Sequence, residues 1–414
     1  MNKKGSFRRA KAPVMTMNES VFRQDMPCTL PHIVTEGKTI TDYAAILSAE
    51  VSEEVLRRGD AFADEIERRH FADFERTWGD APDKMVHVST FRVIDGTVYM
   101  TYYANTETAS EDPTHQTARI AYCPVDDPAA MTVLDVQSVG DEMEGLRVNL
   151  VYDTIFAQTD ESTLMLLWTA KVGERYYRLC RTFSTKDKTM GEIRPNRFRV
   201  GDTENDFSTP GIQNALAANG LPYKTMYSDI GIMQKFTSRV ENGETWYYTG
   251  TYSGDFTAIV KSRDFITWEY VSQPDFPNLS QWENACYIIG DRCYYFVRQH
   301  TPDKYGFLTY YDLCAHTWAK PVLIEDSQSR GDFFLYRGSL FLFHAPIDRD
   351  HIGVVRVNTE DLASSEIVLQ AHMHSSCFYP FVQEFQSGDL GLSYTVARQH
   401  IRLGIFDPEN YLIP

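Results

Sequence analysis

Acidic residues recur beside short apolar runs that read as strands. They are Asp153 in LVYDTIF, Asp229 in MYSDIGI, Glu283 in SQWENACY and Asp332 in SQSRGDFF. Paired carboxylates suit glycosidic-bond cleavage, because a protonated one can protonate the leaving oxygen while an ionised one activates water or attacks the anomeric carbon. The sequence therefore predicts a glycoside hydrolase with Glu283 as general acid and Asp229 or Asp153 as base or nucleophile. Asp332 is expected to tune a pKa or to bind substrate.

Other side chains at the same strand entries could bind a sugar. Trp282 offers a flat apolar platform beside Glu283, and Arg330 could pair with a substrate carboxylate or hold Asp332 ionised. The remaining candidates at strand entries are His87, Asn284, His374 and Tyr379. His87 is equally consistent with a hydrogen-bonded core histidine, and the segment 348–350 (DRD) predicts a solvated turn.

The strands that must position these residues follow a repeat. From about residue 85, aromatic-rich strands pair into hairpins and a third strand follows each hairpin. The turns lie at Asp95-Gly96, Asp160-Glu161, Asn242-Gly243, Gly290-Asp291, Arg337-Gly338 and Ser387-Gly388. The last three intervals match a propeller blade of about 40–50 residues. We therefore predict an all-β propeller of six blades, or five, whose inner strands bring the candidate residues to one channel mouth.

The chain outside this repeat divides into three expected parts. Residues 1–40 form an N-terminal arm, in which 13–17 or 27–34 could supply the strand that closes the last blade. Residues 41–79 read as a helical insert, with Gly59 ending one helix and Asp60 capping a second whose apolar face includes Phe71 and Phe74. Residues 80–414 form the propeller, with insertions at 105–117 and 202–226, and long loops on a rigid scaffold tend to carry function.

Metal and cofactor sites are weakly indicated. His372 and His374 would share one face of a strand, as two metal ligands can, but no third ligand is fixed by the sequence. The chain has no HExxH, GxGxxG, phosphate-binding loop or GxSxG element, so zinc-protease, dinucleotide, nucleotide-hydrolase and serine-hydrolase functions lack support. We expect no metal and no cofactor.

Composition bounds the partners. Lys and Arg number 40 against 57 Asp and Glu, giving a net charge of −17, so binding to nucleic acid or to an anionic membrane is not expected. The seven cysteines form no CxxC pair, and the basic N-terminus precedes no apolar run. We expect a cytoplasmic protein with a small carbohydrate substrate, and the charged helical insert is a candidate surface for a homo-oligomer.

Three segments resemble known propeller families. Residues 261–271 (KSRDFITWEYV) look like a strand–turn–strand element of five-bladed glycosidases and, more loosely, the Asp-boxes of sialidases. Residues 89–103 are similar to the opening strand of sialidases, where an arginine, here Arg92, begins the clamp on the substrate carboxylate. Residues 327–357 resemble blades of sialidase-like propellers, which include uronic-acid lyases and rhamnosidases. The resemblance implies a carbohydrate-active enzyme.

The sequence also departs from these families. A sialidase would show three arginines, a Tyr/Glu nucleophile pair and several Asp-boxes, whereas Arg92, Arg330 and Arg398 are loosely available here with Tyr379 and one shortened box. A five-bladed glycosidase would carry an Asp where His87 stands. A lyase that removes a uronate C5 proton with His87 or Tyr379, and neutralises the carboxylate with Arg330, is therefore the first alternative. A non-catalytic propeller that binds a sugar or a protein is the second.

Overall fold

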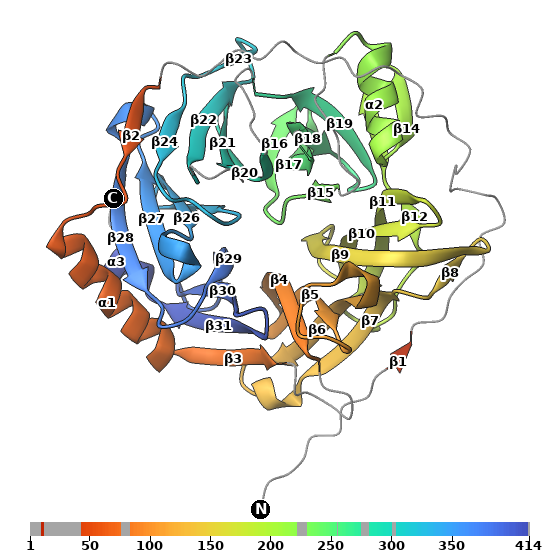
Figure 1. The fold of residues 1–414 in the computed structure, drawn as a ribbon, viewed down its shortest axis with the longest axis horizontal. Helices are drawn as coiled ribbons and strands as arrows, with labels where there is room; N and C mark the ends of the chain where they lie inside the picture. The colour runs from red at the N-terminus through yellow and green to blue at the C-terminus, as the bar shows by residue number, and fades with distance from the viewer. Residues whose placement is uncertain are drawn as a thin grey trace, which may run out of the picture.

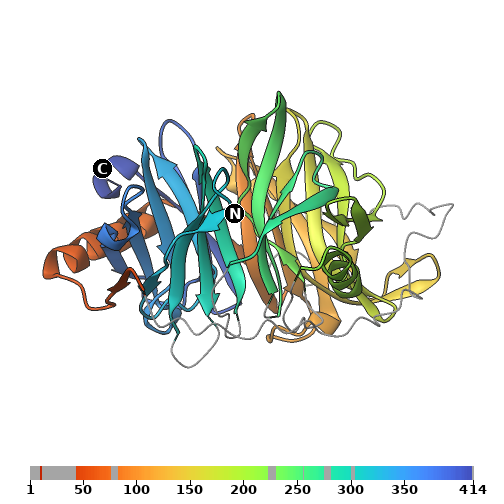
Figure 2. The same ribbon diagram turned by 90° about the horizontal axis from the view of Figure 1, so that it is seen from above.

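A ring of sheets makes up most of the molecule. The computed structural model describes residues 10–11, 43–75, 83–221, 230–254, 256–274, 281–299 and 304–412. Their strands form six sheets around a central axis (Figure 1), and the strands run between the two faces of the ring (Figure 2). This is the architecture of a β-propeller, so the predicted fold class is confirmed.

The sheets are numbered here as blades 1 to 6 in chain order. Blade 1 consists of β1 (Ala10–Lys11), β7 (Thr132–Ser138), β6 (Gln116–Pro124), β5 (Thr97–Asn105) and β4 (Met85–Ile94). Blade 2 consists of β12 (Arg194–Pro195), β11 (Arg175–Ser184), β10 (Thr163–Val172), β9 (Leu146–Gln158) and β8 (Glu142–Met143). Blade 3 consists of β14 (Thr203–Asp206), β13 (Arg197–Val200), β19 (Thr267–Ser272), β18 (Phe256–Ser262), β17 (Glu244–Ser253), β15 (Gly231–Ile232) and β16 (Thr237–Glu241).

The other three blades come from the C-terminal half and from two N-terminal strands. Blade 4 consists of β2 (Ala45–Leu47), β24 (Val322–Ile324), β22 (Gly306–Asp312), β21 (Arg292–Gln299), β20 (Gln281–Ile289) and β23 (Thr317–Trp318). Blade 5 consists of β25 (Asp332–Tyr336), β26 (Ser339–His344), β27 (His351–Val357) and β28 (Glu366–His372). Blade 6 consists of β29 (Phe378–Glu384), β30 (Leu390–Val396), β31 (His400–Phe406) and β3 (His70–Glu75). The helices are α1 (Glu53–Arg68), α2 (Thr209–Ala218), α3 (Pro408–Tyr411), η1 (Pro113–His115), η2 (Pro128–Ala130), η3 (Ile347–Arg349) and η4 (Leu362–Ser364).

Hydrophobic clusters hold each blade against the next. Trp168 belongs to a cluster between blades 1 and 2, Trp268 to one between blades 2 and 3, and Tyr295 to one between blades 3 and 4. Phe296 and Phe333 pack between blades 4 and 5, while further clusters join blade 5 to blade 6 and blade 6 back to blade 1. The aromatic side chains of the repeat therefore fill the interfaces that close the ring.

Several predicted hairpin turns have the expected backbone geometry. Both central residues have positive φ at Asp95-Gly96, Asn242-Gly243, Arg337-Gly338 and Ser387-Gly388. Positive φ at both positions is the signature of the type I′ turn, whose twist matches that of the two strands. The local sequence at these four turns was sufficient to predict the hairpins.

The segment that resembles an Asp-box forms a turn between β18 and β19. The Asp264 carboxylate accepts hydrogen bonds from the backbone N–H groups of Ile266 and Thr267, both at 2.8 Å. The Ser262 hydroxyl accepts one from the N–H of Phe265 at 2.9 Å. Trp268 follows the turn and is fully buried. The conspicuous acid of this segment therefore orders a turn.

Strand β3 closes the last blade. Its residues pair antiparallel with β31, and the buried side chains of Ala72 and Phe74 pack between blades 6 and 1. The expected closing strands at 13–17 and 27–34 lie outside the described residues, and the prediction of a second helix here is wrong. Phe71 and Phe74 fit a helical period, but the burial of Ala72 and Phe74 has the period of two that a strand requires.

In the described part of the insert, a single helix, α1, runs through Gly59. Ser52 caps its N-terminus by accepting a hydrogen bond from the N–H of Val55, and Phe62 and Ile66 bury its apolar face. A Cβ at Gly59 would lie 1.9 Å from the backbone oxygen of Gln370 in β28. Gly59 therefore allows the helix to lie close against blade 5, and the prediction that it ends the helix is wrong.

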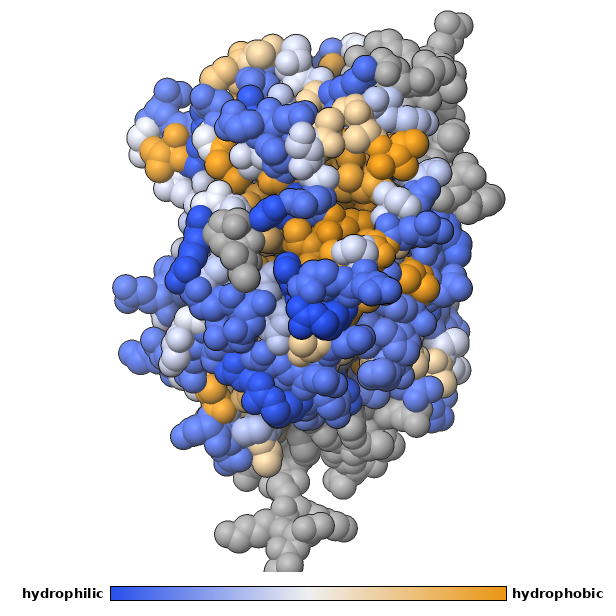
Figure 3. All heavy atoms as spheres, turned by 90° about the vertical axis from the view of Figure 1, so that its left-hand side faces the viewer, coloured by the Kyte–Doolittle hydropathy of each residue, from blue (hydrophilic) through white to orange (hydrophobic). Residues whose placement is uncertain are grey.

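The side of the ring that carries α1 is mainly hydrophilic, with hydrophobic residues in a band between the charged ones (Figure 3). The apolar face of α1 packs inside the same chain and is not available to a partner. The large apolar side chains that remain exposed in this region include Leu56 and Ile46. A homo-oligomer through the insert stays a prediction.

Among the residues that the structure describes, no helix is long and apolar enough to cross a membrane.

Candidate active site

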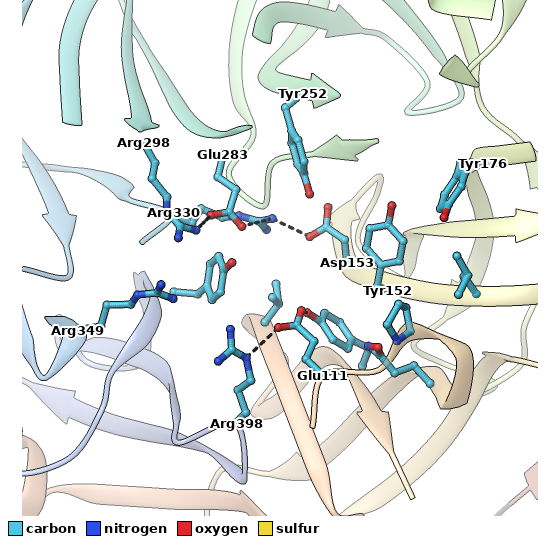
Figure 4. A pocket seen from close by; sticks show the side chains of 16 residues that line it. Glu111, Tyr152, Asp153, Tyr176, Tyr252, Glu283, Arg298, Arg330, Arg349 and Arg398 are labelled. Carbon is cyan, nitrogen blue, oxygen red and sulfur yellow. Dashed lines mark hydrogen bonds and ion pairs between the residues drawn. The ribbon is translucent and has the colours of Figure 1, made fainter. Parts of the chain in front are cut away.

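A cavity of about 450 Å³ lies where the inner strands meet around the axis (Figure 4). Every blade contributes to its wall. The lining residues are Val88, Tyr103, Glu111, Pro113, Gln116, Leu150, Tyr152, Asp153, Tyr176, Tyr252, Glu283, Arg298, Arg330, Arg349, Tyr379 and Arg398. Its size falls within the range of sites for small molecules.

Irregularities in the inner strands place the central residues of this cavity. The ladder register shifts where β4 carries Val88, where β9 carries Asp153, where β20 carries Glu283 and where β29 carries Tyr379. Val88, Asp153 and Tyr379 have φ values of 54°, 55° and 57°, which non-glycine residues seldom adopt. Bulges re-aim side chains, and strained backbone of this kind concentrates at functional sites.

Arg330 joins two of the predicted acids. One of its terminal nitrogens lies 2.9 Å from Asp153 Oδ1 and 3.5 Å from Glu283 Oε1, and the other donates to Gln234 Oε1 at 2.8 Å. Arg178 approaches Asp153 from behind, with a terminal nitrogen 3.3 Å from Oδ2. These groups are almost fully buried, so the network stays in place only because each carboxylate is paired.

Glu283 and Tyr379 form the second part of the centre. The Tyr379 phenol lies beside the Glu283 carboxylate, which forms an ion pair with Arg298. Burial acts to raise the pKa of Glu283, but Arg298, Arg330 and the Tyr379 phenol together lower it to about 2. Burial, reinforced by Glu283, raises the pKa of the Tyr379 phenol. The pair is therefore an ionised carboxylate that holds a protonated phenol.

Positive charge gathers on the side of Tyr379 that faces blades 4 to 6. Arg298, Arg349 and Arg398 line this wall, and Arg398 donates to Glu111 Oε2 at 2.8 Å. Arg349 has no ion pair with any residue that the structure describes, and its guanidinium lies 5.2 Å from the centre of the Phe378 ring. Burial and the neighbouring Arg298 lower the pKa of Arg349, while Tyr379 and Glu283 raise it. We call Arg298, Arg349 and Arg398 the arginine wall.

Tyrosines line the opposite side. Tyr152 and Tyr176 come from blade 2 and Tyr252 from blade 3, and Figure 4 shows them across the cavity from Arg349 and Arg398. Glu111, from the predicted insertion between β5 and β6, lies between the two sides and accepts a hydrogen bond from the Tyr103 hydroxyl at 2.6 Å. The cavity thus has a cationic half and an aromatic half.

The structure brings some of the predicted residues together and places others elsewhere. Asp153, Glu283, Arg330 and Tyr379 line the cavity. His87 lies directly behind Tyr379, with ring centres 4.6 Å apart, and its Nδ1 lies 3.0 Å from the Thr395 hydroxyl. His87 is fully buried, and burial lowers its pKa well below the usual value, so it packs against the site as a neutral ring.

Four predicted residues lie away from the cavity. Asp332 is buried beneath it and pairs with Lys235 at 3.1 Å. Asn284 is also buried and donates to the Thr251 carbonyl and to the Thr257 hydroxyl, so it fastens β20 to blade 3. Arg92 lines a separate cavity, and the His374 ring packs against that of His372. Asp229 and the side chain of Trp282 lie outside the described residues.

Sequence reasoning missed Glu111, Arg298 and Arg349. Arg349 was expected in a solvated turn, whereas the end of η3 brings it, half-buried, to the cavity wall. Arg298 lies near the end of β21, opposite the entry of β20, so a search of second-strand ends as well as first-strand starts would have found it. The described residues contain no group of three metal-ligating side chains that could hold an ion.

The buried pair of Asp332 and Lys235 gives a test of the role predicted for Asp332. Burial raises the pKa of Asp332 to about 6 despite Lys235, so the folded chain holds its proton more tightly than the unfolded chain does. The contribution of Asp332 to stability is therefore largest below about pH 4 and is lost as the pH rises through about 6. We expect Lys235→Met to cost about 3 kcal/mol at pH 7, because it leaves a buried carboxylate unpaired, and less at pH 4.

The matched control is the double variant Lys235→Met/Asp332→Asn, which removes both buried charges and should regain most of the lost stability. Urea unfolding between pH 4 and pH 7 measures both effects. Because Asp332 does not line the cavity, the double variant should keep its catalytic activity. A folded but inactive double variant would show that Asp332 takes part in catalysis.

The fold is that of a sialidase-like β-propeller. Solved structures with this fold include the NanB sialidase of Streptococcus pneumoniae (K499G mutant), with a TM-score of 0.54 and 10% identity over 83% of this chain and 71% of that one. They also include the Hadza microbial sialidase Hz136, with a TM-score of 0.57 and 10% identity over 82% and 69% of the two chains. Trypanosoma rangeli sialidase in complex with sialic acid has a TM-score of 0.50 and 14% identity over 88% and 60%.

No protein-family model matches the sequence, and no curated protein sequence matches it. These structural neighbours are sialidases, so the predicted sialidase-like propeller is confirmed as a fold. At this level of identity the similarity is one of architecture.

Proposed function

We propose that the protein is a glycoside hydrolase that removes a sugar bearing a carboxylate. The observation that carries this proposal is that the Tyr379 phenol and the Glu283 carboxylate lie together in a cavity whose one side is the arginine wall. Sialidases use a tyrosine nucleophile in place of a carboxylate. An anionic nucleophile beside a substrate carboxylate would suffer charge repulsion, whereas a neutral phenol avoids it.

The residues support a retaining mechanism. The Tyr379 oxygen attacks the anomeric carbon and passes its proton to Glu283 while the glycosidic bond breaks. A second acid, Glu111, which lies between the two sides of the cavity, protonates the leaving oxygen and then takes a proton from the water that attacks the tyrosyl–sugar bond. Tyr379 regains its proton from Glu283, so the enzyme returns to its starting state.

This proposal changes the role given to Glu283 by the sequence. A carboxyl group with a pKa of about 2 is ionised at neutral pH and cannot act as the general acid. Its place beside Tyr379 favours the role of base. Arg330, which the lyase alternative needs for the substrate carboxylate, is engaged by Asp153, Glu283 and Gln234.

The two halves of the cavity suggest where the two parts of the substrate, the acidic sugar and the leaving group, would bind. The arginine wall suits the carboxylate, because guanidinium groups bind carboxylates in a planar fork. Tyr152, Tyr176 and Tyr252 offer aromatic faces to the leaving group. A sialic acid, the sugar bound in the trypanosomal structure, is the acidic sugar to test first.

The test is a panel of aryl glycosides of acidic and neutral sugars, with products identified by NMR at early times. Release of the acidic sugar with retained anomeric configuration is the expected result. Hydrolysis of neutral glycosides alone would contradict the proposal. An unsaturated uronide, detected by its ultraviolet absorbance, would establish elimination, and turnover of no glycoside would favour a binding protein.

A further inference from the structure

A second cavity, of about 180 Å³, lies on the other side of Arg330 from the active-site cavity. Its lining residues are Thr90, Phe91, Arg92, Phe156, Ala157, Gln158, Gln234, Lys235, Phe236, Ser238, Tyr247, Phe265, Phe381 and Gln383. This wall includes Arg92 and Lys235 but no Asp or Glu, in a chain whose net charge is −17. We call it the far cavity.

Arg92 and Gln234 offer hydrogen-bond donors to the far cavity. Arg92 makes one hydrogen bond, to Gln158 Oε1 at 2.9 Å, and no ion pair with any described residue. Gln234 is 3% exposed, and its Nε2 has no hydrogen-bond partner among the residues that the structure describes. Since Gln234 Oε1 already accepts from Arg330 at 2.8 Å, the orientation of the amide is fixed and its N–H groups are left to donate.

Lys235 adds a third donor group with a defined position. Its ammonium pairs with Asp332 at 3.1 Å and lies 4.6 Å from the centre of the Phe381 ring. Burial lowers the pKa of both Lys235 and Arg92. Asp332 raises the pKa of Lys235 and Glu384 raises both values, whereas Arg92 lowers that of Lys235, so a repulsion between the two cations remains. An anion between them would relieve that repulsion.

Aromatic rings form a large part of the rest of the wall. Phe91, Phe156, Phe236, Phe265 and Phe381 surround the cavity with Tyr247. A phosphate or sulfate would leave these faces in contact with water, whereas a compact organic anion would cover them. The apolar wall therefore selects for a carbon skeleton, and the planar guanidinium of Arg92 suits a carboxylate.

We propose that the far cavity binds a small organic carboxylate of about the size of benzoate. The carboxylate lies between Arg92, Lys235 and Gln234 Nε2, and its apolar part packs on the phenylalanine rings. The site is separate from the one where the sugar is cleaved, and the proposal does not depend on the proposed function.

The test uses benzoate as the probe in isothermal titration calorimetry of the full chain. Benzyl alcohol is the neutral probe of matched size, and inorganic phosphate is the anion without an apolar part. We expect benzoate to bind at least about tenfold more tightly than either, because each alternative loses one of the two kinds of contact. Equal affinity for benzyl alcohol, or no benzoate binding in the millimolar range, would overturn the proposal.

Two variants locate the site. Arg92→Met should weaken benzoate binding about tenfold or more, through loss of the charge-assisted hydrogen bonds. Ser238→Asp, which adds a negative charge at the exposed rim of the far cavity without touching its buried wall, should also weaken it. The second variant keeps the test decisive if Arg92→Met disturbs folding.

Arg349→Met is the matched control, because it removes an arginine from the active-site cavity. Benzoate binding should be unchanged in this variant. If Arg349→Met abolishes benzoate binding while Arg92→Met and Ser238→Asp do not, benzoate binds to the arginine wall and the far cavity is not a carboxylate site.

Discussion

Replacement of Tyr379 by phenylalanine should lower kcat for hydrolysis of an aryl glycoside of the acidic sugar by about 1,000-fold or more. The change removes one oxygen atom, the one that attacks the anomeric carbon, and loss of a nucleophile removes most of an enzyme's rate enhancement. Stopped assays with an aryl glycoside of the acidic sugar would measure it, and circular dichroism would show that the variant is folded.

The control for Tyr379→Phe is Tyr152→Phe, which removes a phenol oxygen from the opposite side of the same cavity. A loss of less than about tenfold is expected there, because Tyr152 contacts the leaving group only. Similar losses in both variants would contradict the assignment of Tyr379 as nucleophile. Mass spectrometry of the wild type with a fluorinated substrate should show the sugar bound to the peptide that contains Tyr379.

Glu283→Gln tests the partner of the nucleophile. It should lower kcat about 100-fold or more, since the glutamine amide cannot take the phenol proton. Because the pKa of Glu283 is lowered to about 2, the wild-type rate should show no loss through this group above about pH 3. The ionised carboxylate also stabilises the folded state above about pH 4.5, and that contribution is lost as the pH falls towards 2.

The second large effect is expected at the arginine wall. Arg349→Met should lower kcat/KM for the acidic glycoside about 100-fold, because Arg349 has no ion pair among the described residues and its fork is free to meet a carboxylate. Steady-state kinetics with the acidic glycoside and with its neutral carboxamide measure the effect. The carboxamide should be cleaved by the wild type and by the variant at similar low rates.

Arg349→Lys separates charge from geometry. The lysine keeps the positive charge but lacks the planar pair of donors, so a loss of about tenfold is expected, between those of the wild type and Arg349→Met. An equal loss for the acidic glycoside and the carboxamide in Arg349→Met would show that Arg349 supports the fold of the cavity and does not bind the carboxylate.

The identity of the general acid can be tested by comparing substrates with different leaving groups. Asp153 lies on the side of the cavity away from the arginine wall, whereas Glu111 lies between the two sides and accepts a hydrogen bond from Arg398. The variant that removes the acid should lose most activity on alkyl glycosides and little on nitrophenyl glycosides, whose leaving oxygen needs no proton. Asp153→Asn and Glu111→Gln, assayed on both leaving groups, distinguish the two residues.

The sequence alone determined the scaffold. Repeated hairpins with Asp-Gly, Asn-Gly, Arg-Gly and Ser-Gly turns predict strands because these pairs adopt the positive φ that a tight turn needs, and that requirement is local. The entries of the inner strands also located Asp153, Glu283, Arg330 and Tyr379, since a propeller brings corresponding positions of successive blades to one axis.

Tertiary structure decided which of the predicted residues face the cavity and with what charge. The sequence places Asp153 and Asp332 at similar positions in the inner strands of their blades. In the structure, a bulge with a φ of 55° turns Asp153 into the cavity, whereas Asp332 lies in a regular strand and pairs with Lys235. The surroundings of Arg349 and part of the pKa shift of Glu283 depend on contacts between different blades. Such contacts leave no local pattern in the chain, so the sequence indicated carboxylates at the channel mouth, while only the folded ring placed Tyr379, Glu283 and the arginine wall around one cavity.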